Sequence, residues 1–551
     1  MPAIETLSNN TFENFEHHID KPIELSIEQS FPDYRHEAFG SLGLAPQRSF
    51  PGKSSLQNLP PEILTQILHN VISDEGLPPI QTVKLFGRLL TTCWAIYEVG
   101  MPLLYRRVAF SHSRTFDKFR NTLQETRYGE LVKVLDFSAF TSVGLGRTGK
   151  MNQEIQMVTS STILAALESC PNLVEFLAAE SVDPDIDHSV LNKLLEMPHL
   201  RAVDFCGSSG KLIEALIASN FVQCEDQPIT NLTKISFHGC STIPSVVFER
   251  IFPKLVNIKR LDLTHTQVTP EALLALPESL RLSHLSLAKC TKLDSHGLLK
   301  FLILHPATKY LTWLNLMFEA TRPVPISRAD FDTIMRYLNA PLQYLNLYGL
   351  PVTQSHLRHL TKFDLRGLSL GHADINLQTL QDFLPQLPHL EYIDLTGNPN
   401  ITMWTLQDPQ FFEYNSNIGI FEFSADKLSK LNGSAVPGFS VEIGRGRRGW
   451  IRRKAAKPLT RIRSEREMAP ASVGFSFANF ALERLNRRSQ KGHSSRASKA
   501  DDDNSDTIDS GAAWYYASRK VNVSEIGMGG ELQESIATNY KGIYSYYSYH
   551  H

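Results

Sequence analysis

The sequence predicts an α/β solenoid, with a small all-α segment at its N-terminal side and disordered termini. Two observations support this prediction. A six-residue phrase with apolar residues at its first, fourth and sixth positions recurs along the middle of the chain, and a short helical pattern follows most copies. The 551 residues are also more than one compact core usually holds, which favours several domains or an elongated repeat array.

Residues 1–53 are polar and acidic and show no lasting helical or strand period. Such a composition buries too little apolar surface to fold alone, so a disordered arm is expected. The first residues lack the apolar stretch of a signal peptide, and no stretch approaches the roughly 20 apolar residues that a membrane-spanning helix needs. With six scattered cysteines and no CxxC pair, the sequence favours a cytoplasmic or nuclear protein with reduced thiols.

The segment 54–110 changes character and carries short helical stripes. Apolar residues recur at helical spacing over 63–71 and again over 83–93, and a third stripe ends near Leu104. The prolines at 60–61 stand where a helix would begin, since proline suits a first helical turn. A segment this short has few residues with which to bury a core, so we expect it to need a partner.

The phrase L-x-x-L-x-L, with Ile, Val or Phe allowed at the apolar places, organises residues 125–443. Clear copies begin at residues 200, 232, 258, 282, 311, 342, 365 and 390, and weaker copies begin at 132, 173 and 418. From residue 200 onward, successive copies start 23 to 32 residues apart, which is the period of leucine-rich repeats. One strand–turn–helix unit cannot bury its apolar face alone, so the units must stack into a leucine-rich-repeat horseshoe.

The ninth position of the repeat is expected to face inward and to satisfy backbone groups where the strand turns away. It holds Cys240, Thr266, Cys290 and Asn398. The order around the two cysteines resembles the cysteine-containing subclass of leucine-rich repeats, which implies that both thiols are buried and unreactive. No second pair of ligands lies at zinc-finger spacing, so neither a metal site nor a cofactor is predicted.

Residues 444–551 lack the repeat and are predicted to form a mostly disordered tail. The segment 445–457 holds seven bases in thirteen positions, and sixteen bases face three acids across 445–500. An acidic run and a tyrosine-rich end follow. The basic part is most simply a solvated charge run. It also fits a nuclear localisation signal or, over 445–466, a binder of nucleic acid or of an anionic surface, with Trp450 available for stacking or anchoring.

Residues 56–105 resemble the F-box, in the divergent form found in fungal chains. The matching residues are Leu59, Pro60, Glu62, Ile63, Leu64, Ile67, Leu68, Leu90 and Cys93, followed by the run PLLYRRV at 102–108. An F-box followed by cysteine-type leucine-rich repeats is a known family arrangement, so the pair is more specific than either part alone.

The resemblance implies a non-catalytic substrate-recognition adaptor of an SCF-type, cullin-based ubiquitin ligase. The F-box would bind the SCF adaptor of the cullin complex, and the repeats would bind a target protein and hold its lysines near a ubiquitin-charged enzyme. The adaptor contacts carried over from the family are Leu59, Pro60, Ile63, Leu64, Ile67 and Leu68. Two alternatives stay open: the first helical stripe only caps the first repeat, or the chain is a protein-interaction scaffold independent of ubiquitin.

Side chains alternate along each strand, so the third and fifth positions of the phrase are expected on the concave face. Third-position and flanking residues include large aromatic and basic side chains, a composition typical of protein-binding surfaces. The predicted target contacts are Arg260, His284, Trp313, Phe318, Tyr344, Tyr348 and Tyr392. Gly367 would leave a dent between Tyr344 and Tyr392. In the alternative interpretation, the aromatic side chains only stack on each other across strands.

No catalytic set is recognisable in the sequence. It holds no G-x-S-x-G, P-loop or H-E-x-x-H motif. The net charge of −2 at pH 7 gives no reason to expect the chain as a whole to bind nucleic acid or a membrane. The sequence therefore predicts a binding protein and not an enzyme.

Overall fold

The structure is a computed structural model, and it describes the middle of the chain. The described residues are 56, 59–72, 79–110, 113–137, 158–178, 180–208, 210–224, 227–319, 326–431, 436, 438–443 and 448–453. They all belong to one compact unit, and a second unit, residues 454–509, lies outside them. The arm predicted over 1–53 and the tail beyond 453 also lie outside the described residues.

One sheet of fourteen strands runs through the described residues, and its spatial order follows the sequence up to the twelfth strand. Neighbouring strands from β1 to β12 are parallel, whereas β14 pairs antiparallel with both β12 and β13. The strands are β1 Arg107–Ala109, β2 Val134–Asp136, β3 Glu175–Leu177, β4 Ala202–Asp204, β5 Lys234–Ser236, β6 Arg260–Asp262, β7 His284–Ser286, β8 Trp313–Asn315, β9 Tyr344–Asn346, β10 Gly367–Ser369, β11 Tyr392–Asp394, β12 Ile420–Ser424, β13 Phe439–Ile443 and β14 Arg448–Arg453.

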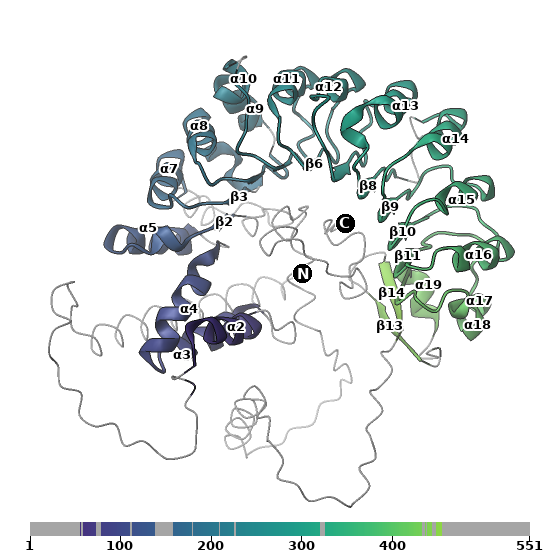
Figure 1. The fold of residues 1–551 in the computed structure, drawn as a ribbon, viewed down its shortest axis with the longest axis horizontal. Helices are drawn as coiled ribbons and strands as arrows, with labels where there is room; N and C mark the ends of the chain where they lie inside the picture. Colours follow the sequence, from purple (N-terminus) through teal and green to yellow (C-terminus); the bar gives the residue numbers. More distant parts are fainter. Residues whose placement is uncertain are drawn as a thin grey trace, which may run out of the picture. The chain divides into compact units, whose positions relative to one another are not determined.

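Helices connect the parallel strands and lie on the outer side of the sheet (Figure 1). The α-helices are α2 Pro61–Ile72, α3 Pro79–Leu90, α4 Trp94–Arg106, α5 Ser113–Glu125, α7 Ser160–Ser169, α8 His188–Glu196, α9 Gly210–Ala218, α10 Asn220–Gln223, α11 Ser245–Ile251, α12 Pro270–Leu274, α13 Ser295–Leu304, α14 Arg328–Tyr337, α15 Gln354–Leu360, α16 Leu377–Phe383, α17 Met403–Gln407, α18 Pro409–Glu413 and α19 Ala425–Leu428. Short 3₁₀ turns are η2 Tyr128–Leu131, η3 Glu180–Asp185, η4 Phe252–Lys254, η5 Pro306–Thr308, η6 Leu384–Gln386 and η7 Ser429–Leu431.

The predicted leucine-rich-repeat solenoid is confirmed. All eight clear copies of the phrase form strands β4 to β11, and the three weaker copies form β2, β3 and β12. The central apolar residue of each strand, such as Ile235, Leu261 or Leu285, is buried in one continuous core between sheet and helices. Each unit therefore completes its core against its neighbours, as the period of the leucines requires.

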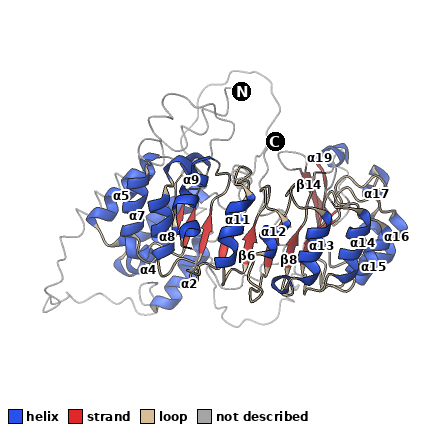
Figure 2. Ribbon diagram, turned by 90° about the horizontal axis from the view of Figure 1, so that it is seen from above, coloured by secondary structure: helices blue, strands red, loops and turns tan. Residues whose placement is uncertain are grey.

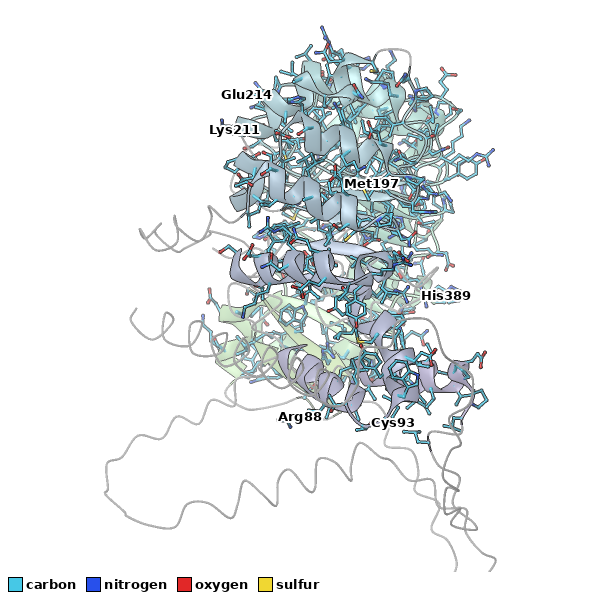
Figure 3. The ribbon with its side chains drawn as sticks, turned by 90° about the vertical axis from the view of Figure 1, so that its left-hand side faces the viewer. Arg88, Cys93, Met197, Lys211, Glu214 and His389 are labelled. Carbon is cyan, nitrogen blue, oxygen red and sulfur yellow. The ribbon has the colours of Figure 1, made fainter. Side chains whose placement is uncertain are left out.

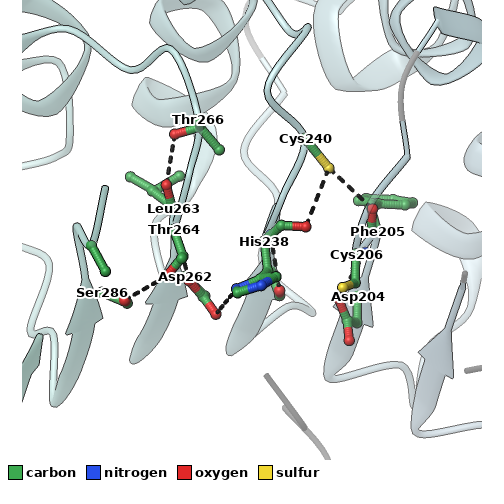
Figure 4. Close-up of polar contacts among 12 residues, drawn as sticks. Asp204, Phe205, Cys206, His238, Cys240, Asp262, Leu263, Thr264, Thr266 and Ser286 are labelled. Carbon is green, nitrogen blue, oxygen red and sulfur yellow. Dashed lines mark hydrogen bonds and ion pairs between the residues drawn. The ribbon is translucent and has the colours of Figure 1, made fainter. Parts of the chain in front are cut away.

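The ninth-position residues are buried at the turns that follow the strands, as predicted (Figure 4). The Cys240 thiol donates to the backbone carbonyl of Phe205 at 3.0 Å, and the Cys290 thiol donates to that of Leu263, also at 3.0 Å. Both carbonyls belong to the preceding repeat, so these thiols tie consecutive units together. Burial raises the pKa of Cys290 to about 12 and that of Cys240 well above its usual value, so both stay protonated.

Helices α2, α3 and α4 form a small core of their own around Leu68, Phe86, Leu90, Ile96 and Met101. Glycine at position 100 allows the helices to approach closely, because a Cβ there would lie 2.2 Å from the Leu90 side chain. Figure 3 views the chain from this side, with Arg88 on α3 and Cys93 at the start of α4.

The helical segment is joined to the first repeat through α4. The chain passes from α4 into β1 without a gap, and β1 pairs with β2 of the repeat sheet. The Tyr97 and Tyr128 hydroxyls lie 2.8 Å apart, and the Tyr105 and Tyr128 rings pack at 4.8 Å between centroids.

The sheet extends beyond the predicted repeat boundaries of 125 and 443 at both ends. At its C-terminal end, part of the predicted disordered tail forms strand β14, and the expectation that Trp450 is available for stacking or anchoring is wrong. Trp450 is 4% exposed and Ile451 is fully buried, on opposite faces of the strand. The alternation of the segment RGWIRR is that of a strand, which its high charge concealed. Arg453, at the end of β14, forms an ion pair with Glu413, at the end of α18, at 2.8 Å.

Candidate protein-interaction surfaces

Helix α2 begins where the sequence predicted. Pro61 is its first residue and Glu62 lies in its first turn, where a carboxylate is favourable. The carbonyl of Pro60 accepts the amide hydrogens of Ile63 at 3.0 Å and Leu64 at 3.1 Å. The Leu-Pro pair therefore sets the start of the helix and the direction of its faces.

The four predicted adaptor contacts that lie within this helix divide between two of its faces. Leu64 and Leu68 are 2% and 4% exposed and point into the interior, because α3 and α4 cover that side. Their assignment as partner contacts is therefore corrected: both are interior residues, and Leu68 belongs to the small core. Ile63 and Ile67, one helical turn apart, are 44% and 37% exposed.

Exposed apolar residues also precede the helix. Pro60 is exposed, Leu59 is half-buried, and Leu56 is 37% exposed. Ile63 and Ile67 share one face of α2, and Leu56 and Pro60 are exposed apolar residues that precede the helix. We call these four residues the α2 strip. The contacts predicted from the sequence did not include Leu56, because it precedes the Leu-Pro pair that marks the motif.

The concave face, the side of the sheet turned away from the helices, carries ion pairs to buried carboxylates in its first half. Arg107 reaches Asp136 at 2.6 Å, and Lys234 reaches Glu175 at 3.6 Å. Burial raises the pKa of Glu175 and lowers that of Lys234, and the attraction between the two groups opposes both shifts.

Further along this half of the face, the His238 ring lies 3.7 Å from Asp262 (Figure 4). Burial, together with Arg260 and Lys234, holds the pKa of His284 well below its usual range, so this ring is neutral at pH 7. Arg260 and His284, two of the predicted target contacts, are half-buried at the surface of this region.

The second half of the concave face is aromatic, but several of the target contacts predicted there are buried. Trp313 is 5% exposed and packs in one cluster with Ala288 and Met317. Its ring stacks on His284 with 6.1 Å between centroids. Large side chains at matching positions of neighbouring strands contact each other. For Trp313, the alternative interpretation, cross-strand stacking, therefore describes the structure.

Tyr392 and Phe318 are also buried, contrary to prediction. Tyr392 is fully buried, and its hydroxyl donates to the carboxylate of Glu422, which also accepts the indole N–H of Trp450 at 3.2 Å. Phe318, 6% exposed, belongs to the main core instead of the concave face. Tyr344 and Tyr348 remain half-buried and reach the surface.

The fifth-position residues have a structural role that sequence reasoning missed. The side-chain oxygens of Asp204, Asp262, Asn315, Asn346 and Asp394 each accept the backbone N–H two residues later, at 2.8 to 3.0 Å. Such Asx turns are the local hydrogen bond that Asp and Asn favour. These side chains stabilise the turn at the end of each strand.

Tyr348 and His372 form an aromatic pair at the turns after β9 and β10. The His372 Nε2 atom lies 2.9 Å from the Tyr348 hydroxyl, and the rings meet edge to face at 5.0 Å. His372 has a positive φ of 62°, uncommon for a residue with a side chain. Glycines make room for the pair, since a Cβ at Gly371 would lie 2.1 Å from the Tyr348 ring.

Known proteins that are similar to this chain include a curated relative and several solved structures. No protein-family model matches the chain. One curated protein, F-box protein YLR352W of Saccharomyces cerevisiae, is 28% identical over 444 residues, which cover 68% of this chain. The chain is similar to an F-box protein. The match spans 55% of that protein, little more than half of its length.

Solved structures also match the chain, at low sequence identity. The yeast Rad7 and Elc1 complex matches 67% of this chain and 93% of the solved chain, with 15% identity and a TM-score of 0.35. The leucine-rich-repeat protein LegL7 of Legionella pneumophila matches 48% and 87%, with 15% identity and a TM-score of 0.30.

Within the described part of the chain, no cluster of three or more His, Cys, Asp or Glu side chains is arranged to hold a metal ion. Among the same residues, no helix has the length and apolar character to cross a membrane. The six cysteines, all described, are not disulfide-bonded.

Proposed function

We propose that this chain is a non-catalytic substrate adaptor of an SCF-type ubiquitin ligase. In this proposal the α2 strip docks on the SCF adaptor of the cullin complex, and the repeats hold a target protein. The chain itself makes or breaks no bond, and its contribution is proximity between a target lysine and a ubiquitin-charged enzyme. Its cysteines, none of which is disulfide-bonded, are compatible with action in the cytoplasm or nucleus.

The observation that carries the proposal is the division of α2 into two apolar faces. Leu64 and Leu68 are buried, while Ile63 and Ile67 stay exposed. Capping of the first repeat does not account for the exposed face, because α4 and β1 make the junction with the repeats. Similarity to an F-box protein supports the same assignment.

The test is capture of a purified SCF adaptor protein by the full chain. Ile63→Asp and Ile67→Asp each remove an aliphatic contact, whose burial stabilises a complex by roughly 1.5–3 kcal/mol. We expect each to weaken capture by at least about ten-fold, the factor that 1.4 kcal/mol corresponds to. Gln66→Asp, on the same helix and exposed, adds the same charge and should leave capture unchanged.

The ubiquitin-independent scaffold is the second candidate. It predicts that the intact, folded chain fails to capture the SCF adaptor, and that result would overturn the proposal. Equal capture by the Ile63→Asp and Gln66→Asp variants would show instead that the docking face lies elsewhere.

For target binding we propose the half-buried residues of the concave face: Arg260, His284, Tyr344 and Tyr348. Tyr344→Ala should release a target protein without loss of adaptor capture. Trp313→Ala is unsuitable as a binding test, because the buried indole contributes to stability.

A further inference from the structure

A second exposed surface lies at one edge of the repeats, away from the α2 strip. Helices α13, α14 and α15 lie side by side on the outer layer (Figure 2). Because the strands they precede are parallel, the C-terminal ends of these helices meet at the same edge of the sheet. Residues in the last turns of the helices and in the loops that follow are therefore neighbours.

Large apolar side chains gather at this edge without a cover. Leu304 ends α13 and is 65% exposed, and Tyr337 ends α14 and is 58% exposed. Tyr310, in the loop after α13, is 50% exposed, with the Arg281 guanidinium 5.0 Å above its ring. These three exposed side chains lie in the last turns of two adjacent helices and in the loop after one of them. Clustered exposed apolar residues mark an interaction site, whereas scattered single ones do not.

The same edge is cationic. Its segments 275–283, 304–312, 336–343 and 358–365 hold five bases, Arg281, Lys309, Arg336, Arg358 and Lys362, and two acids, Glu278 and Asp364. Asp364 is already paired with His389. The bases are all exposed.

Three of these cations lie close to one another. Burial lowers the pKa of His359, and so do Arg358, Lys362, Arg336 and His356. Lys362 donates to the carbonyl of Arg336 at 3.0 Å, which joins the ends of α14 and α15. Like charges held together in this way favour an anionic partner.

We propose that this edge, formed by Leu304, Tyr310, Tyr337, Arg281, Arg336 and Arg358, docks an acidic protein segment that also carries apolar side chains. The aliphatic and tyrosine surface takes the apolar side chains, and the guanidinium groups take the carboxylates, which match their planar geometry. Helix-dipole compensation accounts for Arg336 and Arg358 in last turns. It does not account for the exposed Leu304 and Tyr337 or for the loop cations, and the docking proposal does. The inference does not depend on the proposed function.

The test measures binding of a fluorescent synthetic peptide, in which glutamates are interspersed with leucine and phenylalanine, to the full chain by fluorescence anisotropy. The peptide should bind, and its affinity should fall as salt rises. The double variant R336E/R358E should lose at least about ten-fold in affinity, the factor that 1.4 kcal/mol corresponds to. R336K/R358K keeps the charges and should retain most of the binding.

Two matched controls separate docking from general charge and from folding. Lys193→Glu reverses a cation in the last turn of α8, several repeats before the proposed edge, so it alters a helix dipole away from the site and should leave binding unchanged. Leu304→Ser combined with Tyr337→Ser should weaken binding while all cations remain. Wild-type affinity in R336E/R358E would overturn the proposal. So would equal or tighter binding of a peptide with serine in place of leucine and phenylalanine, or of an oligouridine probe.

Discussion

Trp450 gives the sharpest test of the described fold, because it lies in a segment whose composition predicts disorder. Its indole packs against Tyr392 and Ile420 and donates to the buried carboxylate of Glu422 at 3.2 Å. Trp404, on α17, is 81% exposed and serves as a control for loss of a tryptophan as such. The two changes, Trp450→Ala and Trp404→Ala, remove the same atoms from opposite environments.

The expected magnitudes differ several-fold. A buried tryptophan replaced by alanine typically lowers the free energy of unfolding by about 3–5 kcal/mol, through lost transfer energy and a cavity. Glu422 would also lose the indole N–H donor, and leaving a buried carboxylate less satisfied places the effect towards the upper end of that range. Trp404→Ala should change the free energy of unfolding by less than about 0.5 kcal/mol.

Urea unfolding followed by circular dichroism measures the difference, with the midpoint and slope fitted for each variant. A repeat array can lose its end before the rest unfolds, so amide exchange in β12 and β14 should be measured alongside. Trp450→Ala should increase exchange in those strands first. Equal midpoints and equal exchange for the two variants would refute the placement of β14 in the sheet.

Three further predictions concern local packing and titration. Gly100→Ala should destabilise the helical segment by about 1–3 kcal/mol, because its Cβ would lie 2.2 Å from a leucine side chain. Gly87→Ala has nothing within 4 Å of its Cβ and should stabilise α3 by roughly 0.5–1 kcal/mol. Thermal unfolding of each variant measures both effects. Burial raises the pKa of Asp185 to about 6, so folding favours its protonated form. The stability that protonated Asp185 contributes should be present near pH 4 and lost as pH rises through 6. In a pH series of unfolding midpoints, this pH dependence should be absent from Asp185→Asn. In the native chain at pH 8, Cys240 should resist a thiol reagent, while the half-buried Cys93 should react; rapid native-state labelling of Cys240 would contradict its buried role.

The repeats were predictable because two spacings of the leucines each carry structural information. The spacing within the phrase gives the strand, and the distance between phrases gives the stacking. The ninth-position cysteines followed from the same count, since a buried turn has a fixed need for hydrogen-bond partners. Strands near the two ends of the sheet were harder to predict, because β1 and β14 lack the phrase and form by pairing with neighbouring strands.

The surfaces were less predictable than the fold. Alternation correctly places Trp313 and Tyr392 off the main core, but it cannot tell that neighbouring aromatic rings and Glu422 bury them. Helical spacing likewise groups Ile63 with Leu64, and only the positions of α3 and α4 decide which of the two is covered. Exposure depends on tertiary neighbours, and one strand or helix does not contain that information.

Hydrogen–deuterium exchange of the full chain with and without the SCF adaptor tests the central claim most directly. Adaptor docking through the α2 strip predicts slower exchange at residues 61–72 and unchanged exchange in β4 to β11, which stay available for a target. Unchanged exchange in α2 at saturating adaptor, or protection confined to the repeats, would contradict the account.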